Sequence, residues 1–228
     1  PKVEDQPVNI TIAQGSIEEY PADTIIVNLF AGVTAPAGAT GAVDNALDGA
    51  ISELIRYHDL SGKRGECVVL YPRGVIPAKR VLVVGLGEAQ DFDMEGVRGA
   101  AATAIRQARQ HKAQQVATIV HGAGIAGLPV AVATQAMVEG SLLATYRFDA
   151  DKQQNDQHDI DLLTVVEFSA GKIGAIETGV AAATAFSAGV HLARDLVNMP
   201  PNVATPTRMA QAAEQIAGEH GMKLTIGD

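Results

Sequence analysis

The 228-residue sequence has few aromatic and charged residues and only one cysteine. It contains no tryptophan, aromatic residues make up 4%, and charged residues make up 19% where about 25% is usual. Apolar residues reach 47%, so we expect a core built from Val, Ile, Leu and Ala. Chains of this length bury about 70% of the surface that is exposed when they are unfolded. The core therefore needs no disulfide or metal to support it.

Positive charge is also scarce, with 17 basic against 26 acidic side chains and a net charge of −9. This balance argues against a nucleic-acid partner, including a role as a DNA-binding accessory domain. The single cysteine, Cys67, cannot form an internal disulfide, which favours a reducing, cytoplasmic location. No apolar run approaches the roughly 18 residues of a membrane span, and the N-terminus lacks a signal-peptide pattern. We therefore expect no membrane partner.

The hydrophobic pattern alternates between strands and helices. A continuous apolar run predicts a strand over Thr24–Phe30 that is covered on both faces. Further strands are predicted at 8–12, 66–71, 80–84, 115–121 and 160–168, and helices at 43–55, 97–108 and 129–147. The connection from 66–71 to 80–84 is too short for a crossover helix. The sequence therefore predicts an α/β domain with a mixed sheet, and the polar stretch 149–159 predicts a loop before its last strand.

The organisation changes after residue 171. An Ala-rich pattern predicts a long linker helix over 172–198, which Pro200 and Pro201 end. Thr205 and Pro206 then predict the start of another helix, to about Gly218, and Met222–Ile226 resembles a strand. One helix and one strand cannot bury their apolar faces alone. We therefore expect three parts, a domain at 1–171, the linker at 172–198 and the truncated start of a second domain at 199–228.

The segment His191–Ala210 resembles the junction between the two domains of the leucyl aminopeptidase (cytosol aminopeptidase) family. The family pattern A-R-D-L-x-N-x-P-x-N-x-x-T-P is matched here at fixed spacing. Its matching positions are Ala193, Arg194, Asp195, Leu196, Asn198, Pro200, Asn202, Thr205 and Pro206. Upstream, the run 80–87 and the helix with Arg98 are similar to the family's strand and R-x-A-A helix. Helix capping and turn formation explain each of these residue types, so we expect the junction residues to have an architectural role.

This resemblance implies that a longer parent protein is a two-metal exopeptidase that removes N-terminal amino acids from peptides. Two divalent ions, Zn or Mn, would activate a water and polarise the scissile carbonyl. The family's metal-binding lysine and carboxylate segments have no counterpart here. The resemblance therefore implies no catalytic residue, no metal ligand and no cofactor within this segment. It also implies a hexameric homo-oligomer, a C-terminal catalytic domain as partner, and peptide substrates for the parent alone.

Three other segments are similar to the macro domain, an ADP-ribose-binding module, and imply a three-layer α/β fold. These segments are 23–28, 38–51 and 119–129. The alternative function is therefore a diphosphate-binding module. The nucleotide-binding residues in this alternative are Asn28, Gly41, Gly122, Gly124 and Gly127. Ser16 replaces the family's adenine-contacting acid and Ala31 its second Asn, so two polar contacts are lost. We prefer a structural and assembly role, in which the glycines form tight turns between strand and helix.

The residues alone offer little other chemistry. The six histidines contain no pair at i and i+4, which argues against a zinc site of the H-E-x-x-H type. The acidic run 91–95 imitates half a calcium loop but has Ala102 at the twelfth position, where glutamate is needed. These acids are expected to begin the helix that follows. The G-x-G-x-x-G match at 122–127 lacks the acidic residue of a dinucleotide site.

Overall fold

A computed structural model describes residues 8–122, 127–148 and 160–227 of the chain. The predicted loop at 149–159 lies outside these described residues. The described residues fall into two compact units. The first comprises residues 8–122, 127–146 and 160–187, and the second comprises 147–148 and 188–227.

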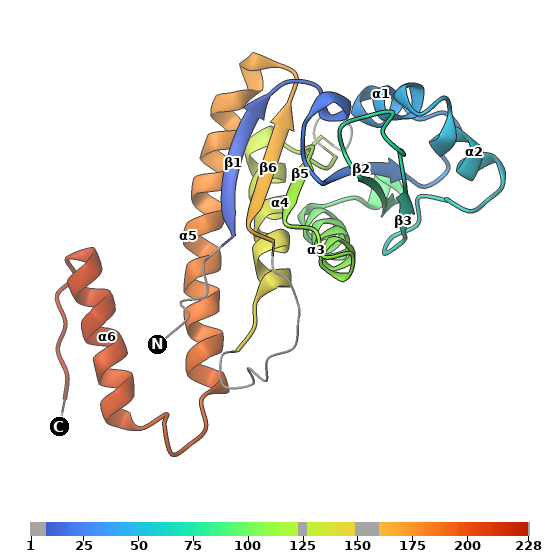
Figure 1. Ribbon diagram of the computed structural model, residues 1–228. Coiled ribbons are helices and arrows are strands. Elements are labelled where there is room, and N and C mark those ends of the chain that lie inside the picture. The colour runs from blue at the N-terminus through green and yellow to red at the C-terminus, as the bar shows by residue number, and fades with distance from the viewer. Residues whose placement is uncertain (1–7, 123–126, 149–159, 228) are drawn as a thin grey trace. The chain divides into compact units, whose positions relative to one another are not determined.

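Within the described part of the chain, six strands form one sheet in the first unit (Figure 1). The strands are β1 (Asn9–Gln14), β2 (Thr24–Phe30), β3 (Cys67–Leu70), β4 (Arg80–Gly87), β5 (Gln115–Thr118) and β6 (Leu162–Glu167). Their order is β1-β6-β5-β2-β4-β3. All neighbours pair in parallel except β3, which is antiparallel to β4 at one edge. The prediction of a mixed sheet, based on the short connection before β4, is confirmed.

The central strand β2 contributes to the core on both faces of the sheet, as its continuous apolar run predicts. Ile26 and Phe30 belong to one buried cluster, and Ile25 and Val27 belong to the other. Successive side chains of a strand point to opposite faces, so a strand that is apolar throughout needs a cover on each side. The sheet is therefore the middle layer of the first unit.

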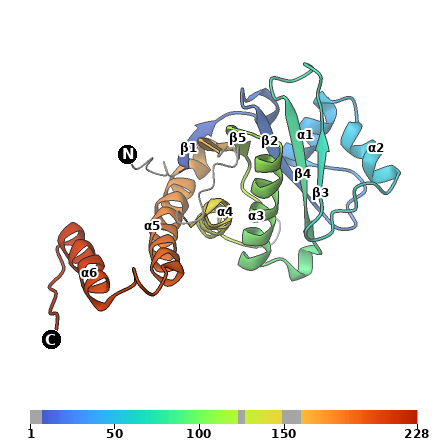
Figure 2. The ribbon, with the colours of Figure 1, turned by 60° about the horizontal axis from the view of Figure 1, so that its bottom comes forward.

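Helices provide both covers. The first cluster includes residues of α3 (Met94–Gln110), α4 (Val130–Thr145) and α5 (Ile173–Asn198). The second cluster includes residues of α1 (Gly38–Ala46) and α2 (Ala50–Arg56). Figure 2 shows α3 and α1 on opposite sides of the sheet. The predicted three-layer α/β architecture is confirmed.

A partly buried ion pair joins α3 to α4. The Arg98 Nε atom lies 2.7 Å from Glu139 Oε2, and Gln135 Nε2 donates to Glu139 Oε1 at 2.7 Å. A Cβ added to Gly140 would lie 2.3 Å from the Arg98 carbonyl oxygen, so only glycine allows the two helices this approach. A buried carboxylate is tolerated where it is paired and hydrogen-bonded. The pair therefore fixes how α3 lies on α4.

The helix predicted over 43–55 is wrong in one respect, because the structure divides this region into α1 and α2. Asp48 and Gly49 between them have φ angles of 55° and 82°, in the left-handed region that breaks a helix. The Asp44 carboxylate accepts hydrogen bonds from the Ile51 N–H at 2.7 Å and the Ser52 N–H at 3.0 Å. Asp44 thus satisfies the free amides at the start of α2. The apolar stripe continues across the break, so periodicity alone could not reveal it.

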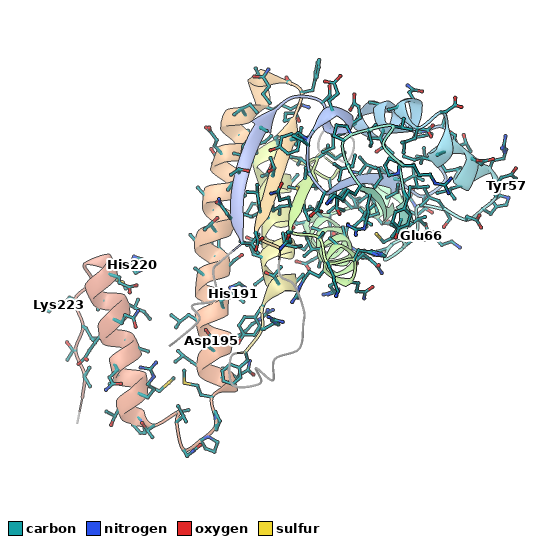
Figure 3. The ribbon with its side chains drawn as sticks, viewed as in Figure 1. Tyr57, Glu66, His191, Asp195, His220 and Lys223 are labelled. Atoms are coloured by element: carbon teal, nitrogen blue, oxygen red, sulfur yellow. The ribbon has the colours of Figure 1, made fainter. Side chains whose placement is uncertain are left out.

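The loop before β3 is held by Glu66, which is labelled in Figure 3. Its carboxylate accepts hydrogen bonds from the backbone N–H groups of Ser61 at 2.9 Å and Lys63 at 3.2 Å.

The single cysteine, Cys67, has a free thiol and is half-buried. Burial raises the pKa of the Cys67 thiol to about 11, so the reactive thiolate is scarce at neutral pH.

The second unit contains the end of α5 and α6 (Pro206–His220). The Thr205 hydroxyl accepts a hydrogen bond from the Arg208 N–H at 3.3 Å, which confirms the predicted cap. The helix ends at left-handed Gly221, between the labelled residues His220 and Lys223 (Figure 3). The predicted strand at 222–226 is wrong, since these residues form no strand. A strand needs a neighbour for its hydrogen bonds, and an alternating pattern does not supply one.

The long helix is also more apolar than expected. Residues Ala170–Asn198, comprising the turn at 170–172 and α5, are long and apolar enough to cross a membrane, with a mean hydropathy of 1.3 over 18 residues. On length and composition the expectation that no segment meets this test is wrong. Only 22% of that 18-residue window is buried. Ile176 and Ala183 of α5 are fully buried in the first unit.

Candidate functional site

The first unit contains a cavity of about 490 Å³ at the carboxyl ends of four parallel strands. Its lining comes from the ends of β1, β2, β5 and β6 and from the start of α1. The polar and charged side chains among the lining residues are Ser16, Glu18, Asn28, Thr40, Glu167 and Lys172. Ligands of open α/β sheets bind at this edge, and small-molecule sites have volumes of roughly 300–1,000 Å³. The cavity is therefore the candidate binding site.

The first turn of α1 forms one part of the lining. Gly38, Ala39 and Thr40 all line the cavity, and the preceding residue, Ala37, provides no side-chain cap. The Thr40 hydroxyl donates to the Asn28 carbonyl oxygen at 2.7 Å, which ties the helix to β2. The first amides of a helix have no partner within it and carry partial positive charge. This part of the cavity can therefore bind a negatively charged group.

Two carboxylates and one ammonium group give the lining its charge. Glu18 comes from the short helix η1 (Ile17–Glu19), Glu167 is the last residue of β6, and Lys172 lies beyond the end of that strand. The Lys172 Nζ atom lies 3.5 Å from Glu167 Oε1, which also accepts a hydrogen bond from the Ser169 N–H at 2.9 Å. Two negative charges against one positive leave a formal charge of −1. The lining as a whole therefore disfavours a polyanion such as a diphosphate.

The Asn28 side chain is hydrogen-bonded to a buried histidine. The Asn28 Nδ2 atom lies 3.1 Å from the Nδ1 atom of His121, whose side chain is fully buried. Burial lowers the pKa of His121 to about 4, so the ring is neutral at pH 7. With Asn28 donating, Nδ1 is the acceptor and the ring proton is on Nε2, which has no partner among the described residues. The pair fixes Asn28 without adding charge to the cavity.

The structure separates the residues predicted for nucleotide binding. Asn28 and Gly122 line the cavity, but Gly41 does not appear in its lining. Gly122 and Gly127 have φ angles of +70° and +68°, as expected for tight turns, whereas Gly41 lies inside α1. The turn role predicted for Gly41 is therefore wrong. Glycine is needed there for its small size, because a Cβ at this position would lie 2.8 Å from the Pro36 carbonyl oxygen. Gly124 lies outside the described residues.

Sequence reasoning missed most of the charged lining. Ser16 does line the cavity, at the position where the macro pattern has an acid, but Glu18 two residues later went unnoticed. Glu167, Phe168 and Lys172 were also missed. The signal available for Glu167 and Phe168 was their place at the end of a buried strand, where parallel strands present ligand-binding residues.

The described residues do not offer a metal centre. In the ranges 8–122, 127–148 and 160–227, no three His, Cys, Asp or Glu side chains come together as a ligand group. In the acidic run 91–95, the Asp93 carboxylate accepts the Gly96 N–H at 2.8 Å and caps α3, as expected. The two ions that the aminopeptidase resemblance implies therefore do not fit this part of the chain.

A three-layer α/β unit with a cavity at the carboxyl ends of its strands is the architecture expected of the macro-like class of domains. Within that class, residues 26–155 match the model of the cytosol aminopeptidase family, N-terminal domain. This chain belongs to the cytosol aminopeptidase family. A "Probable cytosol aminopeptidase" of Alkaliphilus oremlandii is 33% identical over 221 residues, which are 96% of this chain and 44% of the relative. The chain thus spans less than half of that relative.

Solved structures agree on the fold. A mutant of tomato leucine aminopeptidase matches with a TM-score of 0.77 and 23% identity, over 97% of this chain and 44% of that one. A Trypanosoma brucei macrodomain in complex with ADP-ribose matches with a TM-score of 0.60 and 16% identity, over 75% of this chain and 68% of that one. Both likenesses support the fold of the first unit.

Proposed function

We propose that this chain is the structural, non-catalytic part of a two-metal aminopeptidase that removes N-terminal amino acids from peptides. The match of residues 26–155 to the family's N-terminal domain carries this proposal. The two divalent ions, Zn or Mn, belong in this proposal to a downstream catalytic domain, together with the peptide substrate. The setting is the cytoplasm, in keeping with the family name, and neither nucleic acid nor a membrane is a partner.

The proposed division of the chain has three parts. Residues 1–171 form the N-terminal domain, 172–198 the linker helix, and 199–228 the start of the catalytic domain. Support comes from α6, where Ala217 alone among the described residues of that helix is buried. Met209 is 46% exposed, and Met222, Leu224 and Ile226 after the helix are all more than a third exposed. Apolar groups of this size gain stability when another surface covers them.

Catalysis by the chain itself can be tested directly. We expect no hydrolysis of leucine p-nitroanilide above the blank with Mn²⁺ or Zn²⁺ added, because the described residues provide no ligand group for these ions. A full-length cytosol aminopeptidase serves as the positive control under the same conditions. Metal-dependent turnover by the purified chain would contradict its non-catalytic role.

The assembly role needs a second test. A chimera would join this chain to the part of the Alkaliphilus oremlandii relative that follows the aligned region. We expect metal-dependent peptidase activity and a hexamer by light scattering, with the relative's C-terminal part alone as the comparison. An active chimera that stays monomeric would argue against an assembly role. A C-terminal part that is hexameric and fully active alone would argue against it equally.

A further inference from the structure

The cavity combines features that separately favour opposite charges. The first amides of α1 favour an anion, and the Glu18 carboxylate favours a cation. Glu18 is half-buried and has no ion-pair partner among the described residues, whereas Glu167 is already paired with Lys172. A ligand that carries one charge of each sign would satisfy both parts of the lining. A polyanion would satisfy one part and be repelled by the other.

The two charged parts belong to one cavity. The short helix η1, which carries Glu18, packs against α1, and Glu18 and the first turn of α1 both contribute to the lining. A small ligand with its two charges a few atoms apart can therefore fit between them. An α-amino acid meets this condition, since a single carbon joins its ammonium and carboxylate groups.

The rest of the lining is apolar. Ile17, Ile119, Val120 and Val166 form the walls, and the Phe168 side chain, which is 78% exposed, also lines the cavity. Burying a Leu-sized side chain against such walls favours binding, because it removes apolar surface from water. Among α-amino acids, the walls therefore favour those with an aliphatic or aromatic side chain.

We propose that the cavity is a binding site for a free α-amino acid with an apolar side chain, held by its carboxylate at the start of α1 and by its ammonium group at Glu18. Asn28, fixed by His121, supplies a neutral polar contact in the same cavity. The choice of leucine as the natural probe rests on the proposed function, because free amino acids are the products of an aminopeptidase. In that setting the site would report product concentration to the parent enzyme.

Calorimetric titration of the 228-residue chain tests the site. We expect L-leucine to bind, and leucinamide and N-acetyl-leucine, which each lack one charge, to bind at least tenfold more weakly. We expect ADP-ribose to bind more weakly than leucine. No heat from leucine up to about 10 mM would overturn the proposal. Equal binding of leucine and N-acetyl-leucine would also overturn it, because Glu18 would then have no role.

Charge variants sharpen the test. Glu18→Gln should weaken leucine binding at least tenfold, whereas Glu19→Gln, which changes an exposed residue of η1 outside the lining, should leave it unchanged. Glu18→Gln should strengthen ADP-ribose binding, because it removes a repulsive charge. Weaker binding of both ligands to a folded Glu18→Gln variant would contradict this assignment of charge.

A second variant keeps the test independent of folding at η1. Phe168 is so exposed that Phe168→Ala should leave the fold intact, yet it should weaken leucine binding several-fold. Phe186→Ala, at another exposed phenylalanine outside the lining, is the matched control. Unchanged leucine binding to Phe168→Ala would contradict the placement of the leucine side chain against Phe168 in this cavity. These assays cleave no peptide bond, so their failure would leave the proposed place of the chain in the enzyme untouched.

Discussion

The two helices α3 and α6 begin in the same way but are stabilised very differently. Each has a side-chain cap, Asp93 for α3 and Thr205 for α6. In α3, seven residues are buried in the core of the first unit, whereas in α6 only Ala217 is buried. Helices in proteins derive most of their stability from packing rather than from capping or propensity. Local sequence signals can therefore define a helix without telling how firmly it is held.

The largest contrast between the two units is expected from truncating one apolar side chain in each. Leu163→Ala removes a fully buried side chain of β6 and should lower the free energy of unfolding by about 2–5 kcal/mol. Met209→Ala, in α6, should change it by less than about 0.5 kcal/mol. Urea unfolding followed by circular dichroism gives both values. Equal losses for the two variants would mean that the second unit shares a cooperative core.

The pH dependence of stability should come largely from the first unit. The pKa of His121 is about 4 in the folded chain, below its usual 6.5, so the unfolded chain binds the extra proton between these values. Stability contributed by neutral His121 is therefore complete above pH 6.5 and is lost as the pH falls toward 4, by about 3 kcal/mol.

Urea unfolding of the unchanged chain and of the variants His121→Gln and His220→Gln, each at pH 4.5, 5.5 and 7, measures this effect. His121→Gln should flatten the fall in stability, and His220→Gln in the second unit, where the side chain is exposed, should not. The same slope in the His121→Gln variant as in the unchanged chain would mean that this ring is not the sensitive group.

The ion pair between α3 and α4 should have an intermediate effect. Glu139→Ala leaves the Arg98 guanidinium without its buried partner and should cost about 2 kcal/mol, less than for a fully buried pair because 27% of the Arg98 side chain is exposed. Glu95→Ala removes the exposed partner of the same arginine and should cost less than about 0.5 kcal/mol. Comparable losses of stability in the two variants, measured by thermal unfolding, would mean that the burial of Glu139 does not make its pair with Arg98 stronger than the exposed pair with Glu95.

The smallest contrast concerns the caps themselves. Asp93→Ala should lower the stability of the first unit by about 1 kcal/mol. Thr205→Ala should leave the main unfolding transition where it is, because α6 contributes little to the core. Calorimetric scans of the two variants measure this difference. A main transition that falls equally in both would show that α6 unfolds together with the sheet.

The sequence predicts the strands and the mixed sheet well, because Thr24–Phe30 and its neighbours carry patterns that local chemistry explains. It fails where one particular side-chain contact or a strand from another part of the chain decides the structure. The break at Asp48 depends on the Asp44 carboxylate reaching the amides of α2, and the residues at 222–226 lack a neighbouring strand. The cavity unites Glu18 and Glu167, which lie 149 positions apart (167 − 18), through the parallel pairing of β1 with β6. No local pattern records such a pairing.

The contrast between the two units implies that the α/β unit is a complete folding unit and that α6 depends on a surface outside it. Hydrogen exchange followed by mass spectrometry tests this directly, because it reports stability segment by segment. We predict that amides of β2 and β4 exchange only on global unfolding and that amides of α6 exchange nearly as fast as in an unfolded chain. Protection in α6 equal to that in β4, at a concentration where the chain is monomeric, would contradict the claim.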